Sequence, residues 1–538
     1  MKTKFLVAGL IGLFGMAASA DQFSRPESLV PGAKPRRSCE SLVSLKLPGA
    51  EVKSAVVVND NAEAGSWCDV IASVTPATDE NNEVLIRIGL PIERWNGRFF
   101  GAGGGGYKTS SPLRNLSMAS MGYFDAVELG YAVGTTDGGG VKEETWDLAL
   151  RHGNYALDPN GRLNWPAVQN FGYAAIHDMT VVGKALVGEF YGAAPQYSYF
   201  AGCSTGGRQG MMEAQRYPRD YQGIMSAAPP LYWPKIAMLE LWGALVMQRE
   251  NDFMPACKLN AATAAAVPAC DALDGASDGV IADPKRCHFD AKKLVGKKIE
   301  NCGVFDDKDA RVVNAIWQGP RTRDNEFLWY GSSRAAPLLG LNPVAQEPPP
   351  VIMWVGEAWA RYFLTQNPAW DWKTLTGESY EKLWRQSQQQ YGDVLGTDNP
   401  DLSAFRDSGG KMLMWHGTDD QFIPVQGTMD YVGSVQQLMG GSGKVDDFLR
   451  FFVAPGVQHC YPGPSGVFDA LMSWVERGHA PESLPLVKLD ENKKAVRTRR
   501  LCLYPTVSVY RGGDVDKAES FACQLESKTD VSESAARN

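Results

Sequence analysis

The run with the clearest chemical meaning in this 538-residue chain is 202–206, Gly-Cys-Ser-Thr-Gly. It follows the apolar stretch 197–201 and precedes a run of helix formers, 208–217, that ends at Pro218. In the pattern G-x-S-x-G a serine sits on a tight turn between a strand and a helix, and the glycines avoid a Cβ that would collide with a neighbouring element. The run therefore predicts that Ser204 is a nucleophile and indicates a serine hydrolase.

A serine hydroxyl becomes an effective nucleophile when an imidazole accepts its proton and a carboxylate orients that imidazole. In α/β-hydrolases these groups follow one another as serine, acid, histidine. His459 is the favoured base because it lies in the loop after the apolar run 448–453, where a final sheet strand would deliver it. We interpret His416 as a structural residue that bonds its loop and His479 as a surface residue at a helix stop.

The candidate acids lie in the run His-Gly-Thr-Asp-Asp at 416–420, directly after the apolar stretch 412–415. This places two carboxylates at the carboxyl end of a predicted strand, where a triad acid belongs. Spacing leaves both Asp419 and Asp420 open as the acid, and the other of the two could cap the following segment.

The negative charge that develops on the carbonyl oxygen needs two fixed N–H donors. We assign the N–H of Thr205, the residue after the nucleophile, as one donor. The glycine run 101–106 follows an early predicted strand and supplies the other, for which we choose Gly104. Lys108 is not in the frame of a phosphate-binding loop, which excludes nucleotide binding.

Cysteines flank both the nucleophile and the base. If Ser204 and His459 lie within hydrogen-bond reach, their neighbours Cys203 and Cys460 fall within the Cα separation of roughly 4.4 to 6.8 Å that a disulfide tolerates. The sequence therefore predicts a bond that clamps the nucleophile to the base.

These motifs together resemble the tannase and feruloyl esterase family, which also includes mono(2-hydroxyethyl) terephthalate hydrolase. The residues that carry the resemblance are Gly-Cys-Ser-Thr-Gly-Gly-Arg at 202–208, His-Gly-x-x-Asp at 416–420 and His-Cys at 459–460, and it covers nearly the whole mature chain. The resemblance implies a triad of Ser204, Asp420 and His459, which favours Asp420 over Asp419, and a bonded Cys203 and Cys460. It also implies an α/β-hydrolase core with an inserted lid over the substrate.

An acidic run at 270–281 holds three carboxylates within eight residues: Asp271, Asp274 and Asp278. Oxygen donors around a turning backbone suit Ca²⁺, but the spacing is not that of an EF-hand, and an acidic surface loop explains it equally well. The resemblance implies a structural calcium ion in the lid, remote from the chemistry. Its ligands would be the three carboxylates and the carbonyl groups of Ala276 and Val280.

Ten cysteines all lie beyond the first twenty residues, and an even number in an exported chain predicts five disulfides. Beside the pair that clamps the nucleophile, the resemblance implies a bond from Cys270 to Cys287. We pair Cys39 with Cys68 and Cys502 with Cys523 because each pair is local, which leaves Cys257 and Cys302 as partners by elimination.

Alternating apolar and helix-like stretches place the chain in the α/β class. We expect buried parallel strands at 98–102, 131–135, 197–201, 223–227, 412–415 and 448–453, with helices such as 171–190 and 467–477 between them. The middle of the chain is rich in proline and tryptophan and lacks this alternation. We therefore predict a signal peptide at 1–20, the two parts of the hydrolase core at 21–228 and 405–538, and an inserted lid domain at 229–404.

The chain begins with two lysines, an apolar run and Ala-Ser-Ala at 18–20, the pattern of a secretory signal peptide, so we expect a secreted or periplasmic protein. No later apolar stretch has the length to cross a bilayer. The formal charge of −8 without a basic run argues against a nucleic-acid partner. The sequence does not indicate an oligomeric state.

We expect an enzyme that hydrolyses carboxylic esters. The resemblance suggests small-molecule esters of aromatic acids as substrates, as in a feruloyl esterase, with gallate esters or mono(2-hydroxyethyl) terephthalate as alternatives. A binding protein without catalytic activity on the same fold is the rival interpretation, and the intact order of serine, acid and histidine argues against it. A calcium-dependent adhesion or carbohydrate-binding module is a second rival, for which one acidic loop is too little.

Overall fold

The computed structural model describes residues 25–59, 65–74, 82–111, 113, 125–139, 153–339 and 354–525. The predicted signal peptide, 1–20, lies outside these residues. Every helix within the described ranges is too short or too polar to span a bilayer.

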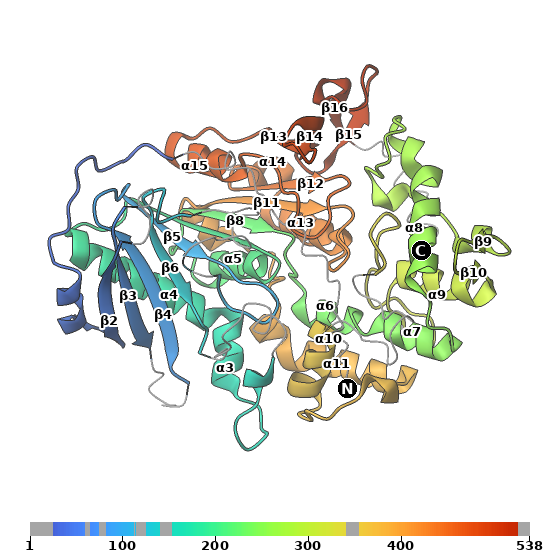
Figure 1. The fold of residues 1–538 in the computed structure, drawn as a ribbon, viewed down its shortest axis with the longest axis horizontal. Coiled ribbons are helices and arrows are strands. Elements are labelled where there is room, and N and C mark those ends of the chain that lie inside the picture. Colours follow the sequence, from blue (N-terminus) through green and yellow to red (C-terminus); the bar gives the residue numbers. More distant parts are fainter. Residues whose placement is uncertain are drawn as a thin grey trace, which may run out of the picture.

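One ten-stranded sheet organises the fold, from the blue strands at the left of Figure 1 to the orange strands near its centre. The strand order is β1-β2-β3-β4-β6-β5-β7-β8-β11-β12. Strands β6 to β12 in this order are parallel, and β1 to β4 extend one edge in antiparallel pairs. The bounds are β1 (Lys46–Leu47), β2 (Ala50–Val58), β3 (Trp67–Val74), β4 (Val84–Pro91), β5 (Arg98–Ala102), β6 (Ala132–Thr136), β7 (Tyr197–Cys203), β8 (Gly223–Ala227), β11 (Lys411–Gly417) and β12 (Leu449–Ala454).

The six runs expected as buried parallel strands are β5, β6, β7, β8, β11 and β12, and their ends differ from the expected ends by at most two residues. This confirms the α/β class. The sequence analysis did not predict the antiparallel strands β1 to β4. Alternate residues of β4 are exposed in its first half, so its apolar run is interrupted by polar and exposed positions and gives a weaker signal than a strand buried on both faces.

Helices cover both faces of the sheet, and the alternation of side chains along each strand separates two cores. In β5, Phe99 packs in the core beneath α4 (Ala175–Tyr191), together with residues of α5 (Thr205–Arg216) and α13 (Val425–Met439). The next residue, Phe100, packs on the opposite face against α15 (Val467–Arg477). The helix α15 has the expected bounds, whereas the expected helix 171–190 is α4 preceded by a π-helical turn, Asn170–Ala174.

The described residues of the segment between β8 and β11, 228–339 and 354–410, contribute no strand to the large sheet. Its helices lie at the right and bottom of Figure 1: α6 (Trp233–Leu239), α7 (Trp242–Glu250), α8 (Ala256–Cys270), α9 (Asp307–Gln318), α10 (Trp354–Ala358) and α11 (Gly377–Leu395). They share a third core with residues of the sheet-bearing part, in which Tyr107 stacks on Phe363 at 5.6 Å between ring centroids. The division into domains at 229 and 404 stays a prediction.

The remaining elements are short. The further helices are α3 (Trp165–Gln169), α12 (Ser403–Asp407) and α14 (Ser442–Val445), and a second π-helical turn spans Trp359–Leu364. Three two-stranded hairpins pair β9 (Lys298–Ile299) with β10 (Gly303–Val304), β13 (Ser483–Leu489) with β14 (Ala495–Cys502), and β15 (Thr506–Tyr510) with β16 (Phe521–Leu525). The last two hairpins form the red region at the top of Figure 1.

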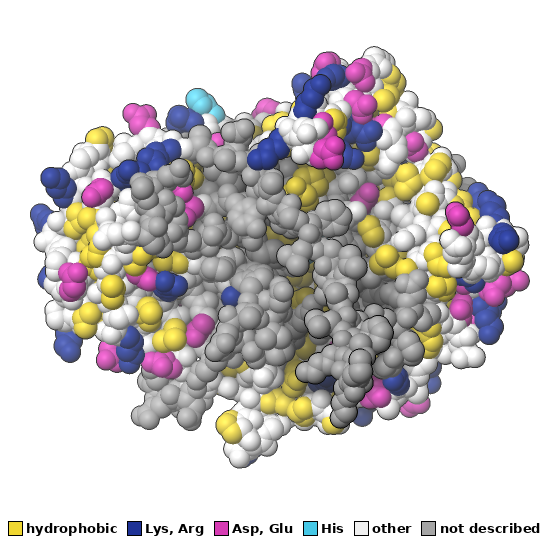
Figure 2. All heavy atoms as spheres, viewed as in Figure 1, with side chains coloured by type: hydrophobic (Ala, Val, Ile, Leu, Met, Phe, Trp, Pro, Cys, Tyr) yellow, Lys and Arg dark blue, Asp and Glu magenta, His cyan; other side chains and the backbone are white. Residues whose placement is uncertain are grey.

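Five disulfides cross-link the described residues, and they are the five pairings expected from the sequence: Cys39–Cys68, Cys203–Cys460, Cys257–Cys302, Cys270–Cys287 and Cys502–Cys523. Four of them close loops of 17 to 45 residues. The bond between Cys203 and Cys460 spans 257 residues and joins the two parts of the sheet. On the face shown in Figure 2, the acidic and basic side chains of the described residues are interspersed and do not form one basic patch.

A buried ion pair ties the start of β5 to α15, and it yields a stability prediction. Arg98, of which 3% of the side chain is exposed, donates to both carboxylate oxygens of Glu476 at 2.6 and 2.7 Å. R98M leaves Glu476 with an uncompensated charge, so we expect a loss of about 3 kcal/mol in the free energy of unfolding. R87M is the control, because it removes an ion pair with Asp69 in which the arginine is half exposed. We expect it to change the free energy of unfolding by no more than about 1 kcal/mol. Denaturant unfolding of both variants tests this, and equal losses would contradict it.

Candidate active site

Ser204 occupies the turn between β7 and α5 with φ 60° and ψ −127°, a conformation that non-glycine residues rarely adopt. Its N–H donates to Ala227 O on β8 at 3.0 Å, which holds the turn against the sheet. A Cβ at Gly202 would lie 2.5 Å from the backbone of Gly206. The two glycines are therefore required by the close approach of backbone to backbone, as the motif predicts.

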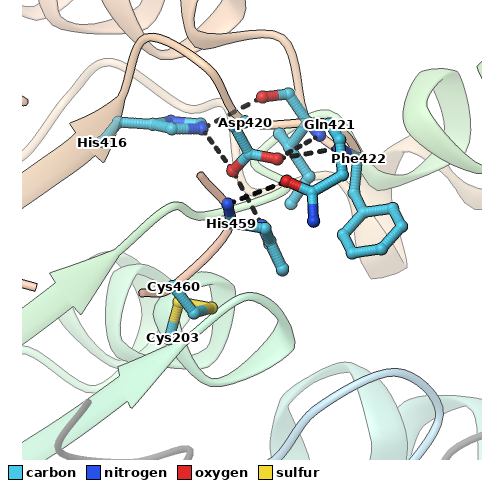
Figure 3. Close-up of a disulfide and its surroundings, with 8 residues drawn as sticks. Cys203, His416, Asp420, Gln421, Phe422, His459 and Cys460 are labelled. Carbon is cyan, nitrogen blue, oxygen red and sulfur yellow. Dashed lines mark hydrogen bonds and ion pairs between the residues drawn. A yellow bond between two sulfur atoms is a disulfide. The ribbon is translucent and has the colours of Figure 1, made fainter. Parts of the chain in front are cut away.

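His459 and Asp420 meet where β12 and β11 end. His459 Nδ1 lies 2.7 Å from Asp420 Oδ2 (Figure 3), and the carboxylate is almost fully buried. The other oxygen, Oδ1, accepts the backbone N–H groups of Phe422 and Ile423 at 2.8 Å each. Because Asp420 can only accept, the proton of a neutral His459 lies on Nδ1, which leaves the lone pair of Nε2 to act as a base.

Burial alone would raise the pKa of Asp420. The positive charge available on His459 and hydrogen bonds from His416 and His459 outweigh this effect and hold the pKa well below its ordinary value. Asp420 is therefore ionised throughout the neutral range, which is the state that orients and stabilises an imidazolium.

The neighbouring Asp419 has a different environment. Its carboxylate accepts the hydroxyl of Thr418 at 2.9 Å, and burial raises its pKa to about 6. Its backbone N–H donates to Val457 O, which braces the loop that leads to His459. The structure thus joins Asp420, and not Asp419, to the imidazole of His459.

The disulfide between Cys203 and Cys460 brings the nucleophile turn to the histidine loop, with a Cα–Cα distance of 6.0 Å (Figure 3). Each sulfur belongs to the residue beside Ser204 or His459 in the chain. Asp420 and His459 are hydrogen-bonded to each other, and the disulfide holds the turn of Ser204 next to the loop of His459. Among the described residues, the Ser204 hydroxyl has no hydrogen-bond partner. Hydrogen bonds of catalytic groups often tighten only when substrate binds.

The prediction that Gly104 N–H faces the substrate is wrong. This amide donates to the buried side chain of Gln209 on α5 at 3.0 Å, so it is not available to an oxyanion. Nearer the nucleophile, the Thr205 hydroxyl donates to Gly106 O at 2.6 Å, which draws the end of the glycine run onto the serine turn. Thr205 is the first residue of α5, and its N–H therefore has no acceptor within the helix.

Two further residues of the site, Gln421 and Phe422, are not part of the sequence motifs. The ring of Phe422 packs edge to face against the imidazole of His459, with centroids 5.1 Å apart. The backbone N–H of His459 donates to Gln421 Oε1 at 3.0 Å (Figure 3). Their place directly after Asp420 was the available signal. Trp359 and Phe363 are fully buried and pack against Tyr391, so they belong to the core.

The acidic run forms a closed loop bracketed by the bond between Cys270 and Cys287. Asp271 accepts the backbone N–H groups of residues 278 to 280 at 3.0 to 3.3 Å. Burial and the charges of Asp278 and Asp271 raise the pKa of Asp274. Asp278 also forms an ion pair with Arg499. Backbone N–H groups and Arg499 thus already engage carboxylate oxygens of Asp271 and Asp278, and among the described residues the three aspartates do not gather their ligand atoms within 4.8 Å of one another. A calcium ion in this loop stays a prediction.

A strained serine between a parallel strand and a helix, beside a buried aspartate–histidine pair, on a sheet covered on both faces, defines a serine hydrolase of the α/β-hydrolase fold. The family model described as tannase and feruloyl esterase matches residues 68–524. The chain belongs to this family of carboxylic ester hydrolases.

Relatives and solved structures agree with this assignment. A probable feruloyl esterase of Arthroderma benhamiae is 35% identical over 95% of this chain and 97% of its own. A mono(2-hydroxyethyl) terephthalate hydrolase of Piscinibacter sakaiensis is 29% identical over 85% of this chain and 84% of its own. The crystal structure of feruloyl esterase B from Aspergillus oryzae superimposes with a TM-score of 0.76 and 25% identity, over 90% of this chain and 99% of that one.

The pKa values of Asp419 and Asp420 are shifted in opposite directions, so we expect replacement of each by asparagine to have opposite effects on the stability of the protein. A carboxyl group whose pKa is raised to about 6 destabilises the native state once it ionises, so D419N should stabilise the protein by at most about 3 kcal/mol at pH 7. That gain should shrink below pH 6 and vanish near pH 4. Asp420 has a lowered pKa, so its ionised form stabilises the native state at pH values above the ordinary carboxyl pKa. We therefore expect D420N to lower the free energy of unfolding more at pH 7 than at pH 4.

Denaturant unfolding of the two variants at pH 4 and pH 7 checks both signs. D419N and D420N remove the same charge one position apart, so each serves as the control for the other. A D419N protein that is less stable than the wild type at pH 7 would refute the environment described for Asp419.

Proposed function

We propose that this protein is an exported serine esterase that hydrolyses esters of aromatic carboxylic acids through an acyl-enzyme. The observation that carries the proposal is the bonded pair of Asp420 and His459, clamped by the disulfide to the turn that holds Ser204. Membership of the tannase and feruloyl esterase family supports it.

In the proposed reaction, Ser204 Oγ attacks the ester carbonyl carbon while His459 Nε2 takes the hydroxyl proton. Asp420 holds the imidazolium that forms, and the N–H of Thr205 donates to the oxyanion of the tetrahedral intermediate. The intermediate collapses as His459 returns the proton to the departing alcohol. Water then attacks the acyl-enzyme with His459 again as the base, and the carboxylic acid leaves Ser204 free.

Aromatic acids are the substrates that the relatives favour. Feruloyl esterases, a tannase and a mono(2-hydroxyethyl) terephthalate hydrolase all match this chain, and the acids in these names share an aromatic ring next to the carbonyl group or joined to it by a vinyl group. The exposed part of Phe422 lies beside His459 and provides an aromatic surface at the reacting centre. We propose hydroxycinnamate esters, such as ferulates, as the main substrates, with gallate and terephthalate monoesters as the alternatives.

We further propose a structural calcium ion in the acidic loop of the inserted segment. The carboxylates of Asp271, Asp274 and Asp278 and the carbonyl groups of Ala276 and Val280 would hold it. A bound ion would neutralise the clustered carboxylates and stabilise the loop between α8 and the disulfide of Cys287, and it supplies no step of the hydrolysis.

We also propose that the protein acts outside the cytoplasm, in the periplasm or the medium. The predicted signal peptide at 1–20 supports this, and so do the five disulfides, because such bonds persist in oxidising compartments.

S204A should lower kcat for methyl ferulate by at least about 10⁴-fold, because no other group can form the acyl-enzyme. S198A, a buried serine on the same strand, is the matched control and should keep wild-type activity. A fluorophosphonate probe should label the wild type and S198A but not S204A. Unreduced turnover by S204A would refute the mechanism, and a wild type that does not label would indicate a binding protein without catalytic activity.

A panel of ferulate, caffeate, gallate and mono(2-hydroxyethyl) terephthalate esters, measured by kcat/KM beside p-nitrophenyl acetate, tests the substrate class. We expect the hydroxycinnamate esters to give the highest values. Acetate as the best substrate would contradict the proposed aromatic specificity.

Dialysis against a calcium chelator should lower the melting temperature by a few degrees, because an ion at 100 times its Kd stabilises the native state by about 2.7 kcal/mol. Calcium should restore it and magnesium should not. D274N should lose the calcium response, whereas D324N, which removes an exposed carboxylate, should keep it. A melting temperature that ignores chelator and calcium alike would refute the site.

A further inference from the structure

The proposed triad acid has two histidine neighbours instead of one. Asp420 Oδ2 lies 2.7 Å from His459 Nδ1 and 3.0 Å from Nε2 of His416, the penultimate residue of β11 (Figure 3). His416 is fully buried, whereas part of His459 is exposed. The second imidazole therefore contacts the carboxylate from the protein side of the site.

The surroundings of His416 determine which ring nitrogen carries its proton. Nε2 lies 3.0 Å from Asp420 Oδ2 and 3.0 Å from the carbonyl oxygen of Ile423, and both of these atoms can only accept. The N–H is therefore on Nε2 and is shared between them. Nδ1 lies 2.8 Å from the hydroxyl of Thr428 on α13, which can donate to the lone pair of a neutral ring.

We propose that His416 is a positioning residue of the esterase: its Nε2–H holds the Asp420 carboxylate in the orientation that His459 needs and limits how strongly that carboxylate attracts the proton of the imidazole. Thr428 orients His416 in turn. The inference rests on the proposed triad and deepens it, because it assigns a role to a residue that does not touch the substrate.

The hydrogen bonds of Asp420 show why a second donor matters. Two backbone N–H groups donate to Oδ1 and fix that oxygen to the loop. On Oδ2, His459 must change its protonation state twice in each half-reaction, whereas His416 is bonded on both nitrogens and stays fixed. Of the described residues, His459 alone would remain bonded to Oδ2 without His416.

Few other groups can disturb this arrangement. The residue in register with His416 on β12 is Val453, and the contact from α13 is the Thr428 hydroxyl, neither of which carries a charge. Among the described residues, the titratable groups beside His416 and Asp420 are His459 and, one position before Asp420 in the loop, Asp419, whose carboxylate accepts the hydroxyl of Thr418. D419N must therefore be measured beside any His416 variant.

H416L removes the donor, and H416Q places an amide N–H near the position of Nε2. In H416L the carboxylate becomes more basic and holds a proton on the neighbouring imidazole more tightly. We expect the acid limb of kcat/KM against pH to move upward by about 0.5 unit or more. We also expect kcat to fall about tenfold or more with little change in KM. H416Q should restore most of the wild-type kcat and most of the wild-type position of the acid limb. Rates are divided by the fraction of protein that a fluorophosphonate labels, so misfolded protein does not count.

T428V removes the hydroxyl that polarises the His416 ring and keeps the shape of the side chain. It should move the acid limb in the same direction by a smaller amount. T180V makes the same change at another buried threonine, on α4, and should leave the limb where it is. If H416L does not fold, the comparison of T428V with T180V still tests the role of His416.

The inference is overturned if the H416L profile superimposes on the wild type, if H416Q is no better than H416L, or if T428V moves the limb no more than T180V. It is also overturned if D419N abolishes the acid limb, because the limb would then report Asp419. An active S204A would overturn the proposed function itself, whereas an inactive S204A with an unmoved H416L profile overturns only the role of His416.

Discussion

An ionised carboxylate in a protein interior must replace the water that it loses, and Asp420 does so with four hydrogen bonds from two backbone N–H groups and two imidazoles. Every other feature of the site depends on this group. Its charge assigns the proton of His459 to Nδ1, which turns Nε2 into the base. Its fixed orientation allows His459 to serve a serine that belongs to a different part of the chain. Burial alone would raise the pKa of Asp420, but the charge available on His459 and the hydrogen bonds from the two imidazoles hold that pKa well below its ordinary value.

The sheet explains how Cys203 and Cys460, 257 positions apart, come together with their neighbours Ser204 and His459. Ser204 follows β7, Asp420 follows β11 and His459 follows β12, and parallel strands present their carboxyl ends at one edge. The disulfide between Cys203 and Cys460 then joins the end of β7 directly to the loop after β12. In the chain-entropy model, closing so long a loop stabilises the fold by about 5 kcal/mol, and it also limits how far the nucleophile and base can separate.

The inserted segment is joined to the sheet-bearing part through an aromatic core. Tyr107 belongs to the loop after β5, yet it packs against Phe171, Trp233 and Phe363 and donates to Val355 O at 2.9 Å. The glycine run before Tyr107 also contacts the nucleophile turn through Thr205. The segment between β8 and β11 and the catalytic turn therefore contact the same short loop after β5.

The sequence by itself determined the nucleophile turn, the six parallel strands, the five disulfides and the order of the reactive groups. The turn depends on glycine where a Cβ cannot fit, and the strands depend on apolar runs that are buried on both faces. The even number of cysteines predicts five disulfides, whereas their pairing also rests on the family resemblance and on the expected proximity of Ser204 and His459. The antiparallel edge strands were missed because their half-exposed residues give no such run.

Only the tertiary structure decided which groups are free to act. Asp419 and Asp420 are chemically identical and adjacent, and the choice between them depends on which carboxylate the histidine loop reaches. The amide of Gly104 is engaged by Gln209, a residue 105 positions away, and the imidazole that bonds Asp420 from His459 comes from 39 positions away. Hydrogen-bond partners of this kind come from contacts between distant segments, which local sequence patterns do not encode.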